Sequence, residues 1–307
     1  MLAPAAEDVD RAPVVPRSHL AALAEAGLFD AGGAREVYEI LAGACGATFF
    51  VWVQHHAPVR LLRASPNVGL ADRWLPRLRS GAVLGGVAFA HLRRPGPPAV
   101  TARPVDGGYA LYGEAPWVTS WGLAEVFAVA ARCGDRVVYV LVPAGAAGLR
   151  PSPPLALLAM QATSTVRIGF DGFTAPEADV ILDLPFDRWL AADRAATARP
   201  NPAAFGVAGT CARLLRDLEP AAAAALEAER LECRARSYGG EPDQVGLRAW
   251  SLELAVRSAL ALVAATGGRS MQASHPAQRL LREAAFYCIQ AQTPALRSAT
   301  LSRLARP

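Results

Sequence analysis

The sequence predicts an α+β protein with an N-terminal helical segment, a middle antiparallel β-barrel or sandwich, and a C-terminal four-helix bundle. Apolar residues recur at helical spacing in the first and last parts of the chain, whereas short β-runs divided by turn residues fill the middle. Hydrophobic residues make up 52% and charged residues 19% of the 307 residues. This composition excludes a disordered chain and allows a sizeable core.

The first part of the chain combines an irregular stretch with a helical domain. Residues 1–16 are rich in proline and alanine without periodicity, so we expect them to be disordered. Residues 17–84 form the predicted N-terminal helical domain. Leu20 and Leu23 share a helical face there, and Gly27 follows as a C-terminal stop.

Two further domains follow. Residues 85–187 form the predicted middle β-domain, in which Gly134 and Asp135 lie between two apolar runs and predict a hairpin turn. Residues 188–307 form the predicted helical bundle. Its third helix (246–268) is apolar almost all round, so we expect it at the centre of the bundle.

Charge and targeting signals narrow the possible partners and compartment. All 31 basic residues are arginine, as in proteins from GC-rich genomes, and the net charge of +4 is scattered, so we expect no nucleic-acid partner. The apolar stretch 255–266 is interrupted by Arg257 and is too short to span a bilayer. No charged segment precedes an apolar core at the N-terminus, so we expect a cytoplasmic protein.

The five cysteines are dispersed and include no C-x-x-C pair. Such a set favours reduced, buried thiols over a disulfide framework or a zinc site, and no metal is expected. The cysteines are Cys45, Cys133, Cys211, Cys233 and Cys288.

The stretch GYALYGEAPWVTSWG, residues 108–122, has an unusual pattern. Its first half alternates like a strand, and Trp117, Thr119 and Trp121 continue the period of two beyond Pro116. Two tryptophans separated by small hydrogen-bonding residues either fill a hydrophobic gap or offer a flat apolar surface with polar groups at its edge.

This stretch resembles a strand of the acyl-CoA dehydrogenase family, in which the pattern G-y-x-l-x-G-x-k-x-W-I-T-N leads to the flavin. Trp117 and Thr119 match the family's tryptophan and threonine, and Ser120 replaces its asparagine. The resemblance implies that Trp117 lies against the isoalloxazine ring of FAD and that Thr119 touches its edge near N5, with Val118 between them. A flavin needs such a flat partner and a few edge donors.

Other segments resemble the same family in the same order, and together they cover the chain from about residue 17 to residue 304. They are residues 78–96, residues 160–181 with Thr163 and Thr165, the pair Gly267-Gly268 at the pyrophosphate position, and residues 275–293. The chain is identified as a divergent, shortened member of the family. The implied FAD contacts are Leu92, Trp117, Val118, Thr119, Gly267 and Gly268.

The sequence departs from the family at the catalytic base, a glutamate that removes the α-proton of an acyl thioester. In most members it lies near the end of the last catalytic helix, where this chain has Ala291. In a minority of members it lies on the first bundle helix, at a position that matches about Arg199 of this chain. Neither side chain accepts a proton, so the catalytic residue is unknown. His91 is the candidate replacement, and His55 and His56 border the implied acyl pocket.

The phosphate contacts also depart from the family pattern. Pro97 and Pro98 replace a Gly-Ser pair and donate no backbone N–H, so Arg93 or Arg94 is expected to hold phosphate instead. The family motif R-x-x-F-G, whose arginine reaches FAD across a subunit interface, has no clear counterpart. Residues 234–240 are only superficially similar, and we expect the loop of that motif to be deleted.

The resemblance implies an FAD-dependent oxidoreductase (EC 1.3 class) that acts on an acyl thioester of CoA or a carrier protein, or on a related small molecule, with its electron acceptor left open. Two alternatives need no base: a catalytically silent subunit of a heteromeric acyl-CoA dehydrogenase, and a flavin-dependent monooxygenase on the same fold. Apolar bundle faces and the family's assemblies also predict a homo- or hetero-oligomer with the bundle at its centre.

Overall fold

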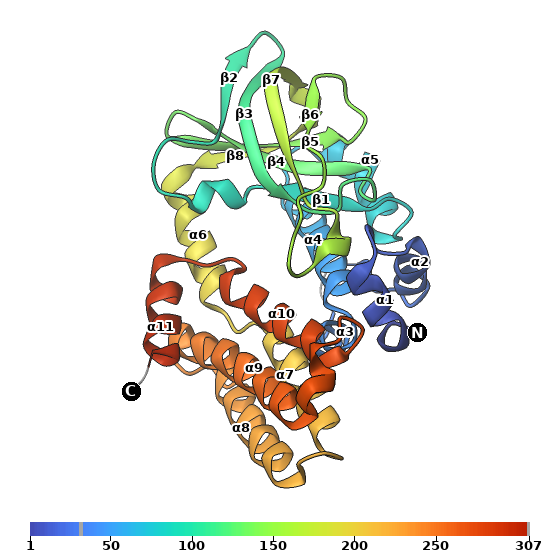
Figure 1. The fold of residues 1–307 in the computed structure, drawn as a ribbon. Helices are drawn as coiled ribbons and strands as arrows, with labels where there is room; N and C mark the ends of the chain where they lie inside the picture. Colours follow the sequence, from blue (N-terminus) through green and yellow to red (C-terminus); the bar gives the residue numbers. More distant parts are fainter. Residues whose placement is uncertain (31–32, 306–307) are drawn as a thin grey trace.

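The computed structural model describes residues 1–30 and 33–305, and it confirms the α+β class with the predicted order of helices, sheet and helices (Figure 1). In the N-terminal part, α4 packs on β1, α3 and α5 and so supports the sheet. The N-terminal elements are η1 (Ala3–Ala5), α1 (Ala6–Arg11), α2 (Arg17–Glu25), α3 (Arg35–Ala44), α4 (Gly46–Arg63) and α5 (Val68–Arg79).

The middle part is a single sheet in the order β6-β7-β3-β2-β4-β5-β8, with β1 paired to β4. Most pairs are antiparallel, as predicted, but β1 and β2 each pair with β4 in parallel, so the sheet is mixed. The connection from β1 to β4 runs through η2, β2 and β3, which is long enough for a parallel pair. The strands are β1 (Gly85–Ala88), β2 (Val100–Val105), β3 (Gly108–Val118), β4 (Val126–Cys133), β5 (Arg136–Pro143), β6 (Leu149–Pro151), β7 (Val166–Pro176) and β8 (Val180–Pro185).

The predicted hairpin turn joins β4 and β5. Cys133 pairs with Arg136 across the turn, and Gly134 has a φ of 60°, a conformation that glycine adopts without steric penalty. The two strands pair over their whole length, and their buried residues belong to the two main apolar clusters.

The C-terminal part is a helical bundle below the sheet in Figure 1. The helix α9 packs against α7, α8, α10 and α11, which confirms it as the central helix. Its helices are α6 (Phe186–Ala198), α7 (Pro202–Leu215), α8 (Pro220–Tyr238), α9 (Gln244–Thr266), α10 (Pro276–Ile289) and α11 (Pro294–Leu304). By length and composition the helical stretch 244–271 could cross a membrane, a test that the core helix of a bundle also passes; half of its most apolar window is buried.

Residues 1–16, predicted to be disordered, instead pack against the bundle. In α1, Ala6 and Val9 are buried. The ion pairs that join α1 to α10 are Glu7 with Arg279 and Asp10 with Arg282. A six-residue helix is too short to produce a visible period, and its charged partners lie 272 residues away. Local sequence patterns therefore gave no sign of this segment.

Candidate functional site

The strand β3 ends in a turn with unfavourable backbone angles. Trp117 has a φ of 60° and Ser120 a φ of 71°, in the left-handed region that residues with a Cβ avoid. The side chain of Trp117 is 50% exposed, whereas Trp121 stacks on Phe127 with 5.6 Å between ring centroids. The second tryptophan of the motif thus packs against the core, and the first presents a flat apolar surface. Such strained turns cluster at functional sites.

A chain of threonine hydroxyls lies beside this turn. Thr163 donates to the carbonyl of Met160 (2.7 Å), and its oxygen lies 2.9 Å from the hydroxyl of Thr165. Because Thr163 has already given its one proton, Thr165 donates to Thr163. Thr119 is 5% exposed and makes a long contact of 3.4 Å with Thr165, so its hydroxyl is held weakly and could turn to a ligand that reaches the end of β3. The backbone N–H of Ser120 donates to the carbonyl of Thr163 and joins the two segments.

Two loops at the end of the bundle contain Ala291 and Arg199, the residues that the resemblance assigns to the family's base positions. In the loop between α10 and α11, Ala291 is partly buried with a φ of 53°, and Gln290 before it caps α10. In the connection between α6 and α7, Arg199 is exposed and caps α6. Neither position carries a carboxylate.

Arg248 of α9, which the sequence did not single out, joins these two loops. Its Nη1 donates to the carbonyls of Thr197 (2.7 Å) and Arg199 (3.3 Å), and its Nη2 donates to the carbonyl of Gln290 (3.2 Å). The side chain is 5% exposed. Burial, with a smaller contribution from the charge of Arg93, lowers the pKa of Arg248 to about 10. One arginine in a long apolar helix gives no sequence signal of this arrangement.

The three candidate histidines are buried and weakly basic. His91 lies in η2 (Ala90–Arg93), donates from Nε2 to the carbonyl of Ala130 (3.0 Å) and leaves Nδ1 without a partner. Burial lowers the pKa of His91 to about 4. His55 accepts from the backbone N–H of Gly85, and burial lowers its pKa to about 3. Burial likewise lowers the pKa of His56 to about 4. Side chains with such pKa values are weak general bases near neutral pH.

The residues expected near the FAD phosphates are only partly free. Leu92 is buried, and its N–H donates to the carbonyl of Phe89. Arg93 is held by Asp193 of α6 through two bonds of 2.9 and 2.7 Å. Arg94 is exposed and forms no ion pair within the described part of the chain. Of the two arginines, Arg94 is therefore the one with its guanidinium available to an anion.

The glycine pair lies at the end of the bundle opposite the base position. Gly267 and Gly268 follow α9, whereas Ala291 follows α10, a helix of 14 residues that spans about 20 Å. A Cβ built on either glycine meets no heavy atom within 4 Å. The backbone at this pair is thus open to a ligand.

The connection between α7 and α8 consists of residues 216–219 alone, as expected from a deleted loop. The similar stretch 234–240 ends α8 instead, and its arginines are paired. Arg234 binds Glu36 and Glu39, and Arg236 binds Glu241. Neither arginine is free to contact a cofactor.

A buried ion pair fixes α10 beneath the site. Arg279 and Glu283, one turn apart, have side chains that are 5% and 3% exposed and lie 3.0 Å from each other. Glu283 also accepts from the N–H of Gly46 (3.1 Å) at the N-terminus of α4, where the helix dipole favours an anion. Burial raises the pKa of Glu283, and the charge of Arg279 opposes this shift. These contacts tie α10, and hence the loop of Ala291, to α4.

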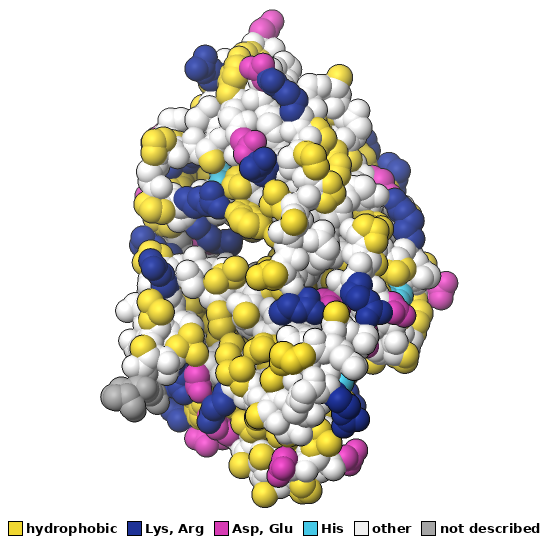
Figure 2. Space-filling model, in the orientation of Figure 1, with side chains coloured by type: hydrophobic (Ala, Val, Ile, Leu, Met, Phe, Trp, Pro, Cys, Tyr) yellow, Lys and Arg dark blue, Asp and Glu magenta, His cyan; other side chains and the backbone are white. Residues whose placement is uncertain are grey.

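Figure 2 shows the molecule hollowed between the sheet and the bundle. Hydrophobic side chains cover much of the hollow's walls, and arginines gather at the end beside α6. The strand β3 runs towards this hollow (Figure 1). The exposed indole of Trp117 and the weakly held hydroxyl of Thr119 fit the ring of a flavin. The proline-rich turn 95–98 offers few N–H donors, so it fits the phosphates of FAD less well.

The cysteines and the acidic side chains give no sign of a metal centre. All five cysteines are free thiols. Within residues 1–30 and 33–305, no group of three or more His, Cys, Asp or Glu side chains could hold a metal ion.

The architecture is that of the acyl-CoA dehydrogenases. Butyryl-CoA dehydrogenase from Megasphaera elsdenii superposes with a TM-score of 0.79 at 16% identity, covering 99% of this chain and 94% of that chain. A glutaryl-coenzyme A dehydrogenase in complex with glutaryl-CoA superposes with a TM-score of 0.83 at 16% identity, covering 99% of this chain and 91% of that chain. The chain therefore has the acyl-CoA dehydrogenase fold.

Sequence comparison points the same way, although no family model matches the chain. Benzylmalonyl-CoA dehydrogenase from Aromatoleum aromaticum is 26% identical over 195 residues, which are 57% of this chain and 52% of that protein. The very long-chain specific acyl-CoA dehydrogenase of Homo sapiens is 25% identical over 129 residues, 36% of this chain and 19% of that protein. The matches thus span about half the first relative and a fifth of the second. The predicted resemblance is confirmed, and the chain is a divergent relative of the acyl-CoA dehydrogenases.

Proposed function

We propose that this protein is an FAD-dependent oxidoreductase of the acyl-CoA dehydrogenase type that acts on an acyl thioester or a related small molecule and lacks the usual catalytic glutamate. The observation that carries the proposal is the strained end of β3, which holds the indole of Trp117 half exposed beside the hydroxyl of Thr119. A purely structural strand end has no need to keep a tryptophan in the left-handed region with its ring in solvent.

The cofactor would be held by contacts of two kinds. Trp117 offers its ring to the isoalloxazine, and Thr119 offers a hydroxyl to its edge. Arg94 and the open backbone of Gly267 and Gly268 are the groups available to the phosphates. A bound flavin would supply a two-electron acceptor. The weak set of phosphate contacts leads us to expect modest affinity for FAD.

The substrate class follows from the relatives. The solved complex contains glutaryl-CoA, and the curated relatives are named for benzylmalonyl-CoA and long-chain acyl-CoA. An acyl thioester lying in the hollow would place its α-carbon near the loop of Ala291. The apolar side chains in the walls of the hollow and the arginines beside α6 are available to bind the thioester.

A second function is favoured by the missing base. Ala291 and Arg199 occupy both base positions, and His91 is a weak base with a pKa of about 4. A catalytically silent subunit that pairs with an active partner would have this pattern, and the exposed apolar residues of the bundle, Leu231, Leu260 and Leu301, are available for such an assembly.

The cofactor proposal is tested by the visible spectrum of the protein purified with added FAD. We expect a flavin spectrum in the wild type, and we expect Trp117→Ala to lower the affinity for FAD by about threefold to tenfold, the usual contribution of one aromatic contact. Trp121→Phe is the matched control, because it keeps an aromatic ring on Phe127 and leaves the indole of Trp117 unchanged. A wild-type protein that takes up no flavin at saturation would falsify the proposal.

A further inference from the structure

The guanidinium of Arg248 has an unused hydrogen-bonding edge. An arginine carries five N–H groups, and three of them are used by the carbonyls of Thr197, Arg199 and Gln290. The Nε–H has no partner although it is buried, and Nη2 retains a second hydrogen. A buried N–H without a partner is unfavourable, so its persistence calls for an explanation.

All hydrogen-bond partners of Arg248 are backbone carbonyls. The charge that affects its pKa is that of Arg93, which Asp193 binds. The negative ends of two helix dipoles make the buried cation tolerable, because Thr197 and Arg199 end α6 and Gln290 ends α10. They leave the Nε–H edge vacant. That edge has the geometry that binds a carboxylate through two parallel bonds.

The location of this edge ties it to the substrate. Gln290, whose carbonyl Arg248 binds, directly precedes Ala291 in the loop where the family's base would face the α-carbon. Where a related enzyme would carry the negative charge of a glutamate, this chain places a buried positive charge. Charge balance in the complex would therefore be restored by an anion that arrives with the ligand.

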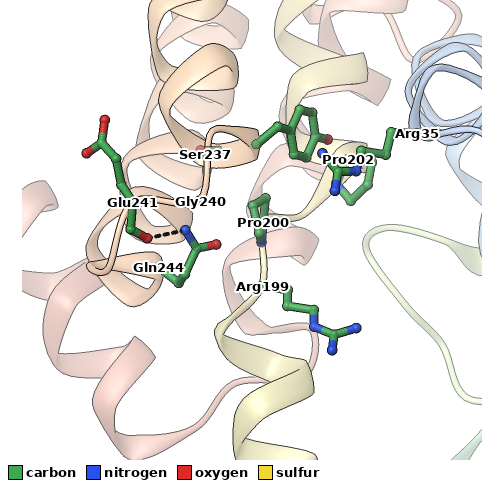
Figure 3. Close-up of a pocket in the computed structure, with 9 residues that line it drawn as sticks. Arg35, Arg199, Pro200, Pro202, Ser237, Gly240, Glu241 and Gln244 are labelled. Carbon is green, nitrogen blue, oxygen red and sulfur yellow. Dashed lines mark hydrogen bonds between the residues drawn. The ribbon is translucent and has the colours of Figure 1, made fainter.

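A groove of about 420 Å³ brings solvent close to the connection between α6 and α7, whose carbonyls Arg248 binds. Arg199 and Pro200 line the groove on one side (Figure 3). Glu241 and Gln244 line it on the other. Gln244 lies four residues before Arg248 on α9 and so one helical turn from it on the same face. The groove thus reaches the turn of α9 that precedes Arg248.

We propose that Arg248 binds a carboxylate that the acyl group carries close to its α-carbon, in addition to the thioester. The ligand is therefore of the malonyl type. This inference rests on the proposed function and adds the substrate class. The carboxylate would accept from Nε–H and the remaining Nη2–H. It would supply the negative charge that both base positions lack.

The test compares two thioesters that differ only in this group. Methylmalonyl-CoA and isobutyryl-CoA have nearly the same volume, with a carboxylate in one where the other has a methyl group. Binding is measured by isothermal titration calorimetry to the purified protein, with its flavin when the flavin is retained. We expect methylmalonyl-CoA to bind about tenfold to a hundredfold more tightly, as a charge-assisted bidentate contact implies.

Variants identify the group responsible. Arg248→Gln should abolish the preference, and Arg248→Lys should retain only part of it, since a lysine keeps the charge without the planar fork. Arg297→Gln is the matched control: it removes an exposed charge of α11 outside the site and should leave the preference within about threefold. A preference that persists in Arg248→Gln, or that disappears in Arg297→Gln alone, overturns the assignment.

The wild-type measurement keeps the two proposals separable even when Arg248→Gln does not fold. Equal affinity for the two thioesters rejects the carboxylate site and leaves the proposed function intact. Binding of neither thioester rejects the proposed function itself. A clear preference for methylmalonyl-CoA supports both.

Discussion

The sheet side of the site and its helical side are built from different kinds of contact. On the sheet side, a strained turn and a chain of hydroxyls present Trp117 and Thr119 much as a flavin ring requires. On the helical side, the loops that would hold the base contain Ala291 and Arg199, and buried Arg248 binds their carbonyls. In the proposed function, the sheet side would hold the cofactor and the helical side would lack the usual proton acceptor. Cofactor binding and proton transfer would then depend on separate parts of the fold, so one could change while the other persists.

The largest expected effect comes from restoring the base. Ala291→Glu should raise the rate of acyl-CoA dehydrogenation by about 10²–10⁴, because a positioned general base contributes that much. The measurement is turnover of FAD-loaded protein with an artificial electron acceptor. Gln292→Glu, which moves the carboxylate by one residue, is the control and should have no such effect. Rapid turnover by the wild type would contradict the proposed lack of a base on the helical side, since it would require another proton acceptor.

The buried ion pair beneath the site gives the next largest effect. Glu283→Ala should lower the free energy of unfolding by about 3–5 kcal/mol, because it leaves Arg279 and the N–H of Gly46 without their main acceptor. Urea denaturation measures this change. Glu283→Gln keeps the size and an acceptor oxygen and should be less harmful. A loss below about 1 kcal/mol in Glu283→Ala would mean that α10 is held mainly by apolar packing.

The pH dependence of stability tests whether His91 is a weak base. Its pKa is lowered by burial from 6.5 to about 4, so its stabilising contribution is present above pH 6.5 and is lost as the pH falls towards 4. The shift corresponds to about 3 kcal/mol. His91→Gln keeps a donor for the carbonyl of Ala130 and should flatten the decline in unfolding free energy between pH 7 and pH 4 by that amount.

The slope of the His91→Gln profile decides the matter. If His91→Gln loses stability with the same slope as the wild type, His91 titrates near its ordinary pKa. The sheet side would then contain a usable base, and the contrast between the two sides would weaken.

The smallest expected effects concern the glycine pair. Gly267 has a φ of 66° and a ψ of −147°, a region that is nearly restricted to glycine, so Gly267→Ala should destabilise by about 1–3 kcal/mol. Gly268→Ala meets no atom and should be close to neutral in thermal unfolding. If the pair approaches the FAD phosphates, Gly268→Ala should still weaken FAD binding. Unchanged affinity would remove the glycine pair from the cofactor site.

Local patterns in the sequence predicted the features that depend on neighbouring residues. The hairpin at Gly134 and the apolar surface of α9 are both set within a few positions. The period of two predicted through Trp117, Thr119 and Trp121 is wrong, because β3 ends at Val118 after a register shift. The resemblance to acyl-CoA dehydrogenases then gave the order of the domains, because its motifs recur at fixed intervals along the chain.

The remaining features depend on residues far apart in the chain. Arg93 was expected to hold phosphate, but Asp193 lies a hundred positions away and neutralises it. Arg248 is one charged residue among apolar neighbours, and its partners belong to two other segments. The parallel pairing of β1 with β4 likewise has no local signature. No periodicity reports such contacts, which is why the helical side of the site was predicted least completely.

The contacts of α10 also affect how the chain is made. Glu7 and the N–H of Gly46 leave the ribosome long before Arg279 and Glu283, with which they pair. The N-terminal helices therefore cannot complete these buried contacts during translation, and pairings over so long a sequence separation slow folding. A nascent chain that stops before α10 would keep an uncapped α4 and an unanchored α1, and we expect it to depend on chaperones until the last helices arrive.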